Sequence, residues 1–306
     1  MFTFEPPPAR SGAVRNNYHC AESLYDSADS FPQPRCHPNT RTEMLDNLYN
    51  WATRSRSRPI GWLHGPAGAG KTAIMQTLCQ RLKAADRLGG AFFFKRHHRT
   101  RGNAKVLFVT LAYQLALNNR SLKSPISRSV KNDPADVGRH MGVQLRKLIV
   151  EPCQSLISCP PLILLIDGLD ECQDEGSQLE ILRLIGDTAG HKVRFLIASR
   201  PEAHIRDVLE EPPFSAILNS VNIEQSFHDV RTYFRNEFAR IQRQHRHTME
   251  NNPTPWPAPG ILEALVHKSS GYFAYASTVI SVLSLNEVYV PSKSSNFLNC
   301  SPGTAG

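Results

Sequence analysis

Gly65-Pro-Ala-Gly-Ala-Gly-Lys-Thr72 is the stretch that decides the fold, because it has the composition of a loop that binds a triphosphate. Its glycines let the backbone turn N–H groups toward one point, and a helix that begins near Gly70 adds the positive end of its dipole. In the common arrangement of such loops, Lys71 reaches the β- and γ-phosphates and the Thr72 hydroxyl ligates Mg²⁺. We therefore expect the nucleotide to contact Gly65, Pro66, Ala67, Gly68, Ala69, Gly70, Lys71 and Thr72.

The residues on either side favour the strand and the helix that a phosphate loop requires. Residues Ile60 to His64 have the composition of a short buried strand that leads into the loop. From Lys71 to Leu82, apolar residues recur at helical spacing, namely Ile74, Met75, Leu78 and Leu82. The alternative is a glycine-rich turn with an exposed lysine, which this context disfavours.

A phosphate loop needs a partner strand that carries an acidic residue, and residues Pro161 to Ile166, followed by Asp167, meet this need. The run is apolar without alternation, as in a strand that is covered on both faces of a parallel sheet. Open α/β sheets bind ligands at the carboxyl ends of their strands, where the Asp167 carboxylate can hold Mg²⁺ through its water shell. The alternative is that Asp167 only caps the following turn.

Asp170 and Glu171 follow as an acidic pair that suits hydrolysis. Nucleotide hydrolysis needs a group that positions and polarises water in line with the γ-phosphate. We expect Glu171 to be that group, with Asp170 beside it, which favours an NTPase over a small-molecule kinase. The alternative is that both residues, with Asp174 and Glu175, form the acidic first turn of the next helix.

Another apolar strand is predicted from Val193 to Ala198, and Ser199-Arg200-Pro201-Glu202 follows it. A polar residue at this end of the sheet can sense the γ-phosphate, and a guanidinium offers a fixed fork for phosphate oxygens. Arg200 is therefore the third candidate catalytic residue. The alternative is an exposed arginine before a helix that begins with proline.

Three segments together, GPAGAGKT, LILLIDGLDEC and RFLIASRPE, resemble the NACHT family of signalling ATPases within the STAND class, particularly its many fungal members. The resemblance extends from about Arg35 to Val282. Four further segments carry it, namely Arg35–Arg41, Ala91–Phe94, Leu111–Leu115 and Ser270–Ile280.

The resemblance implies a site for ATP or ADP with Mg²⁺. By this resemblance Lys71 and Thr72 are the Walker A residues, Asp167 is the Mg²⁺-associated aspartate, and Glu171 with Asp170 are the hydrolytic carboxylates. Family members act as switches in signalling and innate immunity. ADP holds a closed state, and ATP permits oligomerisation by favouring another arrangement.

The resemblance also places Thr40 and Arg41 in the segment that approaches the adenine and ribose, with Asn39 where the family usually has glycine. Family members normally continue into a winged-helix domain and a repeat region that senses the trigger. Because this chain stops at Gly306, we expect it to lack both parts.

The predicted fold is α/β, a P-loop NTPase with a doubly wound, mainly parallel five-stranded sheet, helices on both faces and a small helical lid. A first helix is predicted from Thr40 to Thr53, and strands near Ile60, Ala91, Leu162, Arg194 and Phe214. The resemblance implies strand order 5-1-4-3-2. We expect an irregular N-terminal extension (1–34), a nucleotide-binding core (35–222), a lid of three helices (223–285) and a disordered tail (286–306).

The net charge of +8 comes partly from basic runs such as Lys95 to Arg101. These runs lack interleaved aromatic residues, so we expect a solvated surface and disfavour a nucleic-acid partner; contact with nucleic acid or anionic lipid is the alternative. Lys95 to Arg101 follows a predicted strand and can help to neutralise phosphates. No secretory signal or membrane-spanning run is predicted, which favours a soluble cytoplasmic protein. The seven cysteines form no C-x-x-C pair, so neither a disulfide framework nor a zinc site is expected.

Three functions remain open from the sequence. The leading one is an Mg²⁺-dependent, ATP-binding signalling module that hydrolyses ATP slowly and forms a homo-oligomer or binds other signalling proteins. The second is an interaction module whose nucleotide is rarely turned over. The third is a nucleic-acid-dependent ATPase. GTP is disfavoured, because the chain has no N-K-x-D or T-K-x-D motif.

Overall fold

The computed structural model describes residues 33–54, 57–156, 160–188, 192–247, 249 and 255–285 of the 306-residue chain. The predicted tail (286–306) and all but the last two residues of the predicted N-terminal extension (1–34) lie outside the described residues.

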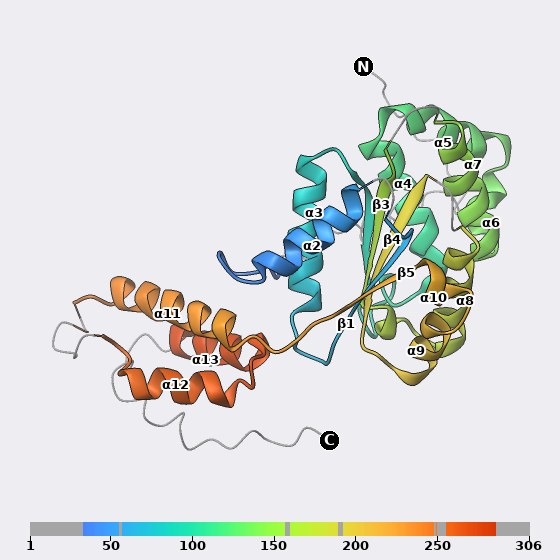
Figure 1. The fold of residues 1–306 in the computed structure, drawn as a ribbon. Helices are drawn as coiled ribbons and strands as arrows, with labels where there is room; N and C mark the ends of the chain where they lie inside the picture. Colours follow the sequence, from blue (N-terminus) through green and yellow to red (C-terminus); the bar gives the residue numbers. More distant parts are fainter. Residues whose placement is uncertain are drawn as a thin grey trace. The chain divides into compact units, whose positions relative to one another are not determined.

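Five parallel strands form one sheet, in the order β2-β3-β4-β1-β5 (Figure 1). This order confirms the predicted 5-1-4-3-2, and the fold class is confirmed with it. The strands are β1 (Ile60–His64), β2 (Leu88–Phe93), β3 (Leu162–Asp167), β4 (Val193–Ser199) and β5 (Leu218–Asn222).

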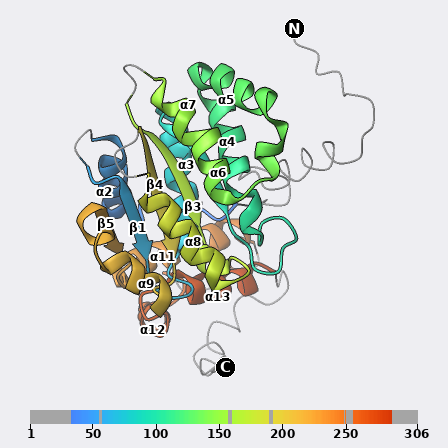
Figure 2. The same ribbon diagram turned by 90° about the vertical axis from the view of Figure 1, so that its right-hand side faces the viewer.

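Helices cover both faces of the sheet. Figures 1 and 2 show α2 and α3 on one face, and α4, α8 and α9 on the other. All six residues of β3 are buried, and the first five are apolar. Alternate residues, such as Leu164 and Ile166, join a core with Leu111 of α4 and Ile181 of α8. The helices up to β5 are α2 (Thr42–Thr53), α3 (Lys71–Ala84), α4 (Leu107–Asn118), α5 (Arg120–Asn132), α6 (Met141–Leu145), α7 (Glu151–Gln154), α8 (Glu175–Gly186), α9 (Ala203–Glu210) and α10 (Phe214–Ile217).

The register of the parallel strands brings their carboxyl ends together at one edge of the sheet. His64 at the end of β1 pairs with Ser199 at the end of β4. Asp167 at the end of β3 pairs with Ala198. The residues that follow these three strands therefore start from the same edge, which is where open α/β sheets bind their ligands.

The edge strand β2 is protected by side chains of α4. Gln114 lies in an otherwise apolar helix, and its amide binds both backbone groups of Ala91: Oε1 accepts from the N–H (2.9 Å) and Nε2 donates to the carbonyl (2.8 Å). Asn118 donates to the Gly89 carbonyl at 3.1 Å. These amides pair backbone groups that an edge strand leaves without a neighbouring strand.

Two predicted boundaries are wrong. The fifth strand begins at Leu218, because Phe214–Ile217 forms the short helix α10 after Pro213 and buries Phe214 against Gly186. The first helix begins at Thr42 and not at Thr40, because Arg41 has a positive φ (55°) that a right-handed helix does not accept.

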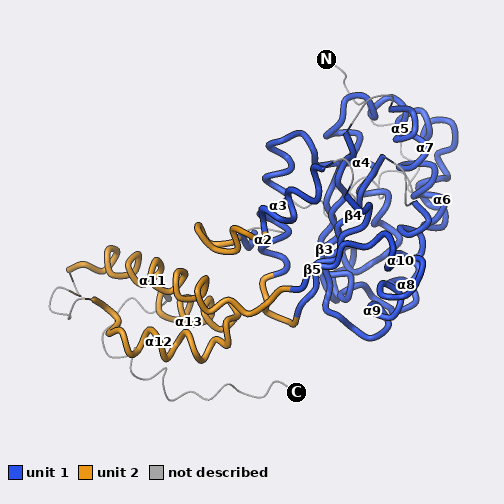
Figure 3. Tube along the Cα trace, viewed as in Figure 1, with its two compact units in different colours: residues 1–35, 45–65, 71–222 blue, residues 36–44, 66–70, 223–306 orange. Residues whose placement is uncertain are grey.

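The chain divides into two compact units, coloured separately in Figure 3. Unit 1 contains the sheet. Unit 2 contains α11 (Phe227–Gln244), α12 (Pro259–Lys268) and α13 (Phe273–Leu285), which correspond to the three predicted helices after Ile223. Their core includes Val230, Phe234, Phe238, Leu265 and Ile280. Residues 36–44 and 66–70 also group with unit 2, although the sequence places them within the predicted core. No helix among the described residues is long and apolar enough to cross a bilayer.

Candidate nucleotide-binding site

The glycine-rich loop adopts a backbone conformation that two of its glycines make accessible. Gly68 and Gly70 have φ values of 74° and 93°, in the region that favours glycine. The Ala69 N–H donates to the Pro66 carbonyl at 3.3 Å and closes the turn between them. A Cβ atom on Gly68 would lie 2.6 Å from the Cβ of Ala274 in α13, whereas one on Gly70 would meet nothing within 4 Å. Gly68 is therefore required for space as well as for conformation.

Lys71 begins helix α3, and its Nζ donates to the Gly65 carbonyl at 2.8 Å. Burial lowers the pKa of Lys71, and the carboxylates of Asp170, Asp167 and Glu171 oppose that effect. The predicted Walker A lysine thus lies in the field of all three acidic candidates. A partly buried ammonium in this position can exchange a carbonyl for phosphate oxygens.

Asp167 is the most unusual group of the site. Its side chain is 3% exposed, and burial raises its pKa to about 7, an effect that Glu171 and Asp170 reinforce. The Thr72 side chain hydrogen-bonds the carboxyl group, and Lys71 lies close enough to favour ionisation. Among the described residues, the Asp167 Oδ1 atom has no hydrogen-bond partner although it is buried.

The donor set around Asp167 fits a Mg²⁺ ion. A carboxylate and a hydroxyl are hard oxygen ligands, and Mg²⁺ in nucleotide sites uses one or two such protein ligands with waters and phosphates for the rest. A buried oxygen without a partner is costly unless a ligand completes its shell. Asp167 and Thr72 are therefore the residues that would hold the ion.

Asp170 holds Arg200 in place at the ends of β3 and β4. The Asp170 Oδ1 atom accepts the Arg200 backbone N–H at 3.0 Å, and Oδ2 lies 3.2 Å from Arg200 Nε. The Asp170 side chain is 5% exposed, whereas that of Arg200 is 41% exposed. The aspartate is thus the buried anchor, and the guanidinium retains donors that face solvent.

Glu171 is bound by the loop that follows β2. Its Oε2 atom accepts the Arg96 backbone N–H at 3.1 Å, and Arg96 Nη2 donates to the Asp170 carbonyl at 3.3 Å. The basic run Lys95 to Arg101 therefore contacts the acidic pair. The position of this run after a strand of the same sheet indicated that it lies near the phosphate site. Nothing in the sequence indicated that Arg96 binds Asp170 and Glu171.

Asp170 and Glu171 do not form the first turn of the next helix. They lie in η5 (Leu169–Glu171), a 3₁₀ turn that follows Gly168 with its positive φ of 69°. Helix α8 begins later, at Glu175, and is capped by Asp174, whose Oδ1 accepts the Ser177 N–H at 2.7 Å. The structure therefore rejects the alternative for this pair, while their roles in hydrolysis stay predictions.

Arg41 is described within unit 2, where its side chain is 7% exposed. Its Nη1 donates to the Glu224 carbonyl at 2.9 Å, its backbone N–H donates to Asp229 at 3.2 Å, and its guanidinium lies over the Phe273 ring. Asn39 has a φ of 64°, which explains why asparagine can replace the usual glycine here. The predicted contact of Arg41 with adenine or ribose stays a prediction.

His64 is a feature of the site that the sequence did not single out. It ends β1 directly before the loop, stacks on Trp62 with ring centroids 4.1 Å apart, and places Nε2 2.9 Å from Ser220 Oγ. Burial lowers the pKa of His64, as does Lys71, while Glu210 opposes them. A neutral imidazole beside the lysine avoids a second positive charge at that point.

A family model described as "Nephrocystin 3, N-terminal" matches residues 39–200, more than half of the chain. This range includes the glycine-rich loop, Asp167, Glu171 and Arg200. A search of curated protein sequences found no significant match.

Two similar solved structures have low sequence identity. The structure of C. elegans PCH-2 is 15% identical, with a TM-score of 0.45, and the match covers 93% of this chain and 71% of that chain. The structure of Drosophila ORC bound to GC-rich DNA and Cdc6 is 11% identical, with a TM-score of 0.42, and the match covers 88% of this chain and 44% of that chain.

Proposed function

Because the chain belongs to the family described as nephrocystin 3, N-terminal, and is a P-loop NTPase of NACHT type, we propose that it is an Mg²⁺-dependent module that binds ATP and hydrolyses it slowly. The observation that carries the proposal is Asp167, a buried carboxyl group with one oxygen that lacks a partner among the described residues. It is hydrogen-bonded by Thr72 and lies in the field of Lys71.

In this proposal, the residues of the loop and α3 bind the triphosphate. Backbone N–H groups of residues 65 to 72 surround the phosphates, and Lys71 leaves the Gly65 carbonyl to contact their oxygens. Thr72 and Asp167 would hold Mg²⁺, which would neutralise part of the phosphate charge. Arg41 approaches the base and ribose, as the resemblance implies.

Glu171 positions and polarises the water that attacks the γ-phosphate. Asp170 contributes by holding Arg200, because its carboxylate binds both the backbone and the guanidinium of that residue. Asp170 is thus a positioning residue, and Arg200 supplies N–H donors to the phosphate oxygens. Since Glu171 is bound to the loop after β2, its carboxylate must leave the Arg96 N–H or share it, which fits slow turnover.

Contacts with the γ-phosphate can supply the free energy that drives a nucleotide-dependent conformational change. A ligand can favour one conformation only through contacts that differ between conformations, and the γ-phosphate is the group that distinguishes ATP from ADP. We infer that ATP and ADP favour different states of this chain inside the cell, and that the ATP state forms homo-oligomers or binds other signalling proteins.

Single-turnover kinetics test the hydrolytic role. We expect Glu171→Gln to slow ATP decay by about 100-fold or more, because it removes a general base but keeps the shape of the side chain. Glu175→Gln, in the first turn of α8, is the matched control and should leave the rate unchanged. An unchanged rate in Glu171→Gln would reject the catalytic assignment and favour an interaction module that rarely turns its nucleotide over.

A second function, a nucleic-acid-dependent ATPase, is favoured by one contact. The backbone of Arg96, within the basic run Lys95 to Arg101, binds the Glu171 carboxylate. A polyanion on this run would therefore change the hydrogen bonding of Glu171. We expect stimulation of turnover by DNA or RNA, with steep salt dependence, if this function is correct. Turnover that does not respond to either polymer at low salt would reject it.

A further inference from the structure

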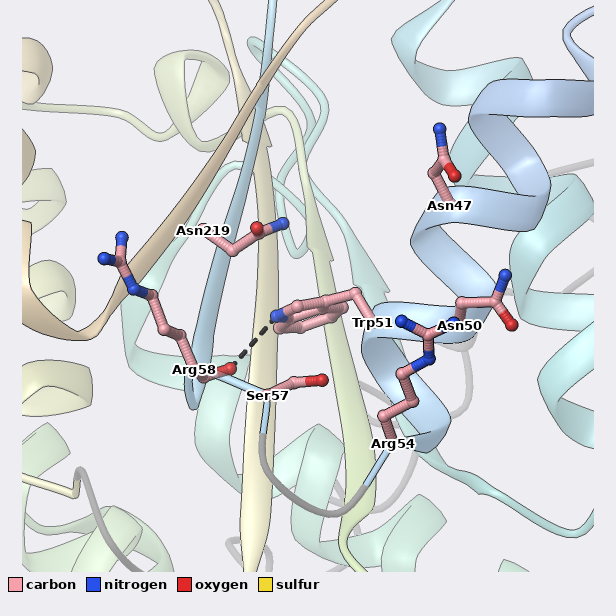
Figure 4. Close-up of a pocket in the computed structure, with 7 residues that line it drawn as sticks. All are labelled: Asn47, Asn50, Trp51, Arg54, Ser57, Arg58 and Asn219. Carbon is pink, nitrogen blue, oxygen red and sulfur yellow. Dashed lines mark hydrogen bonds between the residues drawn. The ribbon is translucent and has the colours of Figure 1, made fainter.

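A second polar pocket lies within unit 1, at the amino ends of β1 and β5 (Figure 4). Its volume is about 340 Å³, at the lower end of the range for small-molecule pockets. The last turns of α2 supply Asn47, Asn50 and Trp51, and β5 supplies Asn219. The residues between α2 and β1 complete it with Arg54, Ser57 and Arg58.

This pocket is separate from the nucleotide-binding site. Asn219 pairs with Gly61 near the start of β1, whereas the phosphate loop follows His64 at the other end of that strand. Parallel strands place all their amino ends at one edge of the sheet and all their carboxyl ends at the other. The two sites therefore lie at opposite edges of the sheet.

The pocket lining is rich in hydrogen-bond donors and carries positive charge. Its side chains include two guanidinium groups, three amides and a hydroxyl, and no carboxylate. Arg58 uses one donor on the Leu218 carbonyl. The Arg54 side chain has no hydrogen bond or ion pair with the described residues. Figure 4 shows the Trp51 ring in the middle of the pocket, between Arg58 on one side and Arg54 with Asn50 on the other.

The acceptors next to the pocket are already used. The Trp51 indole N–H donates to the Arg58 carbonyl at 3.0 Å. The buried Arg194 guanidinium donates to the carbonyls of Trp51 (3.1 Å), Ala52 (3.1 Å) and Arg54 (2.6 Å). The carboxyl end of a helix normally repels anions, because its free carbonyls carry partial negative charge. Arg194 satisfies these carbonyls and places a positive charge next to them.

The one carboxylate of this part of α2 is also paired. Asp46 accepts from Arg81 Nη2 at 2.7 Å and is not one of the residues that line the pocket. With these backbone carbonyls and Asp46 occupied, the charged groups that line the pocket are both cations, and the amides and the hydroxyl can add N–H and O–H donors. Such a set complements an oxyanion.

We propose that this pocket binds a small molecule through an oxyanion, a phosphate or a carboxylate group, with Arg54 as the principal contact. Arg54 presents a fork of N–H donors that matches two oxygens of either group. The Asn50 amide and the Ser57 hydroxyl contribute neutral hydrogen bonds, and the Trp51 ring forms the apolar surface of the pocket.

The test uses inorganic phosphate and malonate as probes and the Trp51 indole N–H signal in ¹⁵N-labelled protein as the readout. The chain has three tryptophans, so the indole region is simple, and Trp51→Phe assigns the signal. At constant ionic strength, at least one probe should shift the Trp51 signal along a saturable curve. The probe that binds more tightly identifies the group that the pocket prefers.

Variants separate this pocket from the phosphate loop. Arg54→Gln should weaken binding about tenfold or more, because a charge-assisted hydrogen bond is lost. Asn50→Asp, which keeps the shape but adds a negative charge, should abolish the saturable shift. Arg128→Gln, at an exposed position of α5, is the matched control and should bind like the wild type.

Lys71→Ala should retain the Trp51 response, so that failure of the nucleotide proposal and failure of this one are distinguishable. If neither probe moves the Trp51 signal, or if Arg54→Gln responds like the wild type, the pocket does not bind oxyanions. Loss of the response in Lys71→Ala would also overturn the proposal, because it would assign the shift to the phosphate loop.

Discussion

Two charged side chains are buried in neighbouring strands of the same sheet, and their surroundings differ. Arg194, near the amino end of β4, is 4% exposed and donates to three carbonyl oxygens at the end of α2. Asp167, at the carboxyl end of β3, is 3% exposed, and its Oδ1 has no partner among the described residues. A buried charge with a complete set of partners stabilises the fold, whereas one with an incomplete set indicates a place for a ligand.

Replacement of Arg194 should have the largest effect on stability. Arg194→Met keeps the length of the side chain but leaves buried carbonyls of α2 without a donor. We expect the free energy of unfolding to fall by about 3 to 5 kcal/mol, measured by urea denaturation. Arg128→Gln, on the exposed surface of α5, should change it by less than about 0.5 kcal/mol. A loss of stability as small as that of the control would show that Arg194 does not stabilise the end of α2.

Asp167→Asn should increase the stability of the folded protein, whereas Arg194→Met should decrease it. In the wild type the folded-state pKa is about 7, well above the unfolded value of about 4, so the unfolded chain ionises first as the pH rises. The stability that the protonated group contributes is complete below about pH 4 and is lost as the pH rises through about 7. Without nucleotide or Mg²⁺, Asp167→Asn should therefore be more stable than the wild type by about 4 kcal/mol at about pH 8, and close to it at about pH 4.

Urea denaturation at several pH values measures this difference. Asp46→Asn is the control, because it makes the same chemical change at an exposed carboxylate. A gap between Asp167→Asn and the wild type that stays constant with pH would contradict the assignment of Asp167 as a buried, readily protonated carboxyl group.

Gln114 is a buried but neutral side chain, and its replacement should have the smallest of these effects on stability. Gln114→Leu removes the amide that binds the N–H and the carbonyl of Ala91, so both backbone groups lose their partner. We expect a loss of about 1 to 2 kcal/mol in the free energy of unfolding. Asn118→Ala, which removes a single hydrogen bond to Gly89, should cost about half as much. Equal stability of Gln114→Leu and the wild type would show that water replaces the amide at this edge.

Much of the sheet could be predicted from the sequence, because β2, β3 and β4 are buried along their whole length and are mostly apolar. Leu162 to Ile166 and Phe195 to Ala198 carry this signal directly. The edge strand β5 carries a weaker one, since alternate residues such as Asn219 and Ser220 are not buried. Because Phe214 is apolar, the fifth strand was predicted there, four residues before its first residue, Leu218.

The hydrogen bonds of the buried polar side chains could not be predicted from the sequence. Arg194 lies inside an apolar strand, and its carbonyl partners are about 140 residues away in the sequence. Gln114 likewise has a partner 23 residues away, on another element. Local patterns predict elements, but a hydrogen bond between distant elements depends on the packing of the whole unit.

The predicted site residues of unit 1 do lie together, because a phosphate loop and the ends of parallel strands constrain their positions. Lys71, Asp167, Asp170 and Glu171 interact electrostatically, and Asp170 binds Arg200. The sequence could not predict that Asp170 anchors Arg200 while Glu171 binds the loop after β2. Both contacts depend on the 3₁₀ turn after Gly168, which turns the two adjacent side chains toward different partners.

The most direct test of the central claim is the thermal stabilisation of the protein by Mg²⁺ and nucleotide. At about 100 times the dissociation constant, ATP or ADP with Mg²⁺ should stabilise the wild type by about 2.7 kcal/mol, seen as a rise in Tm. Lys71→Ala should abolish that rise, because it removes the cation that binds the phosphates. A Lys71→Ala protein that keeps the full rise in Tm would contradict the account, since the nucleotide would then bind somewhere other than this loop.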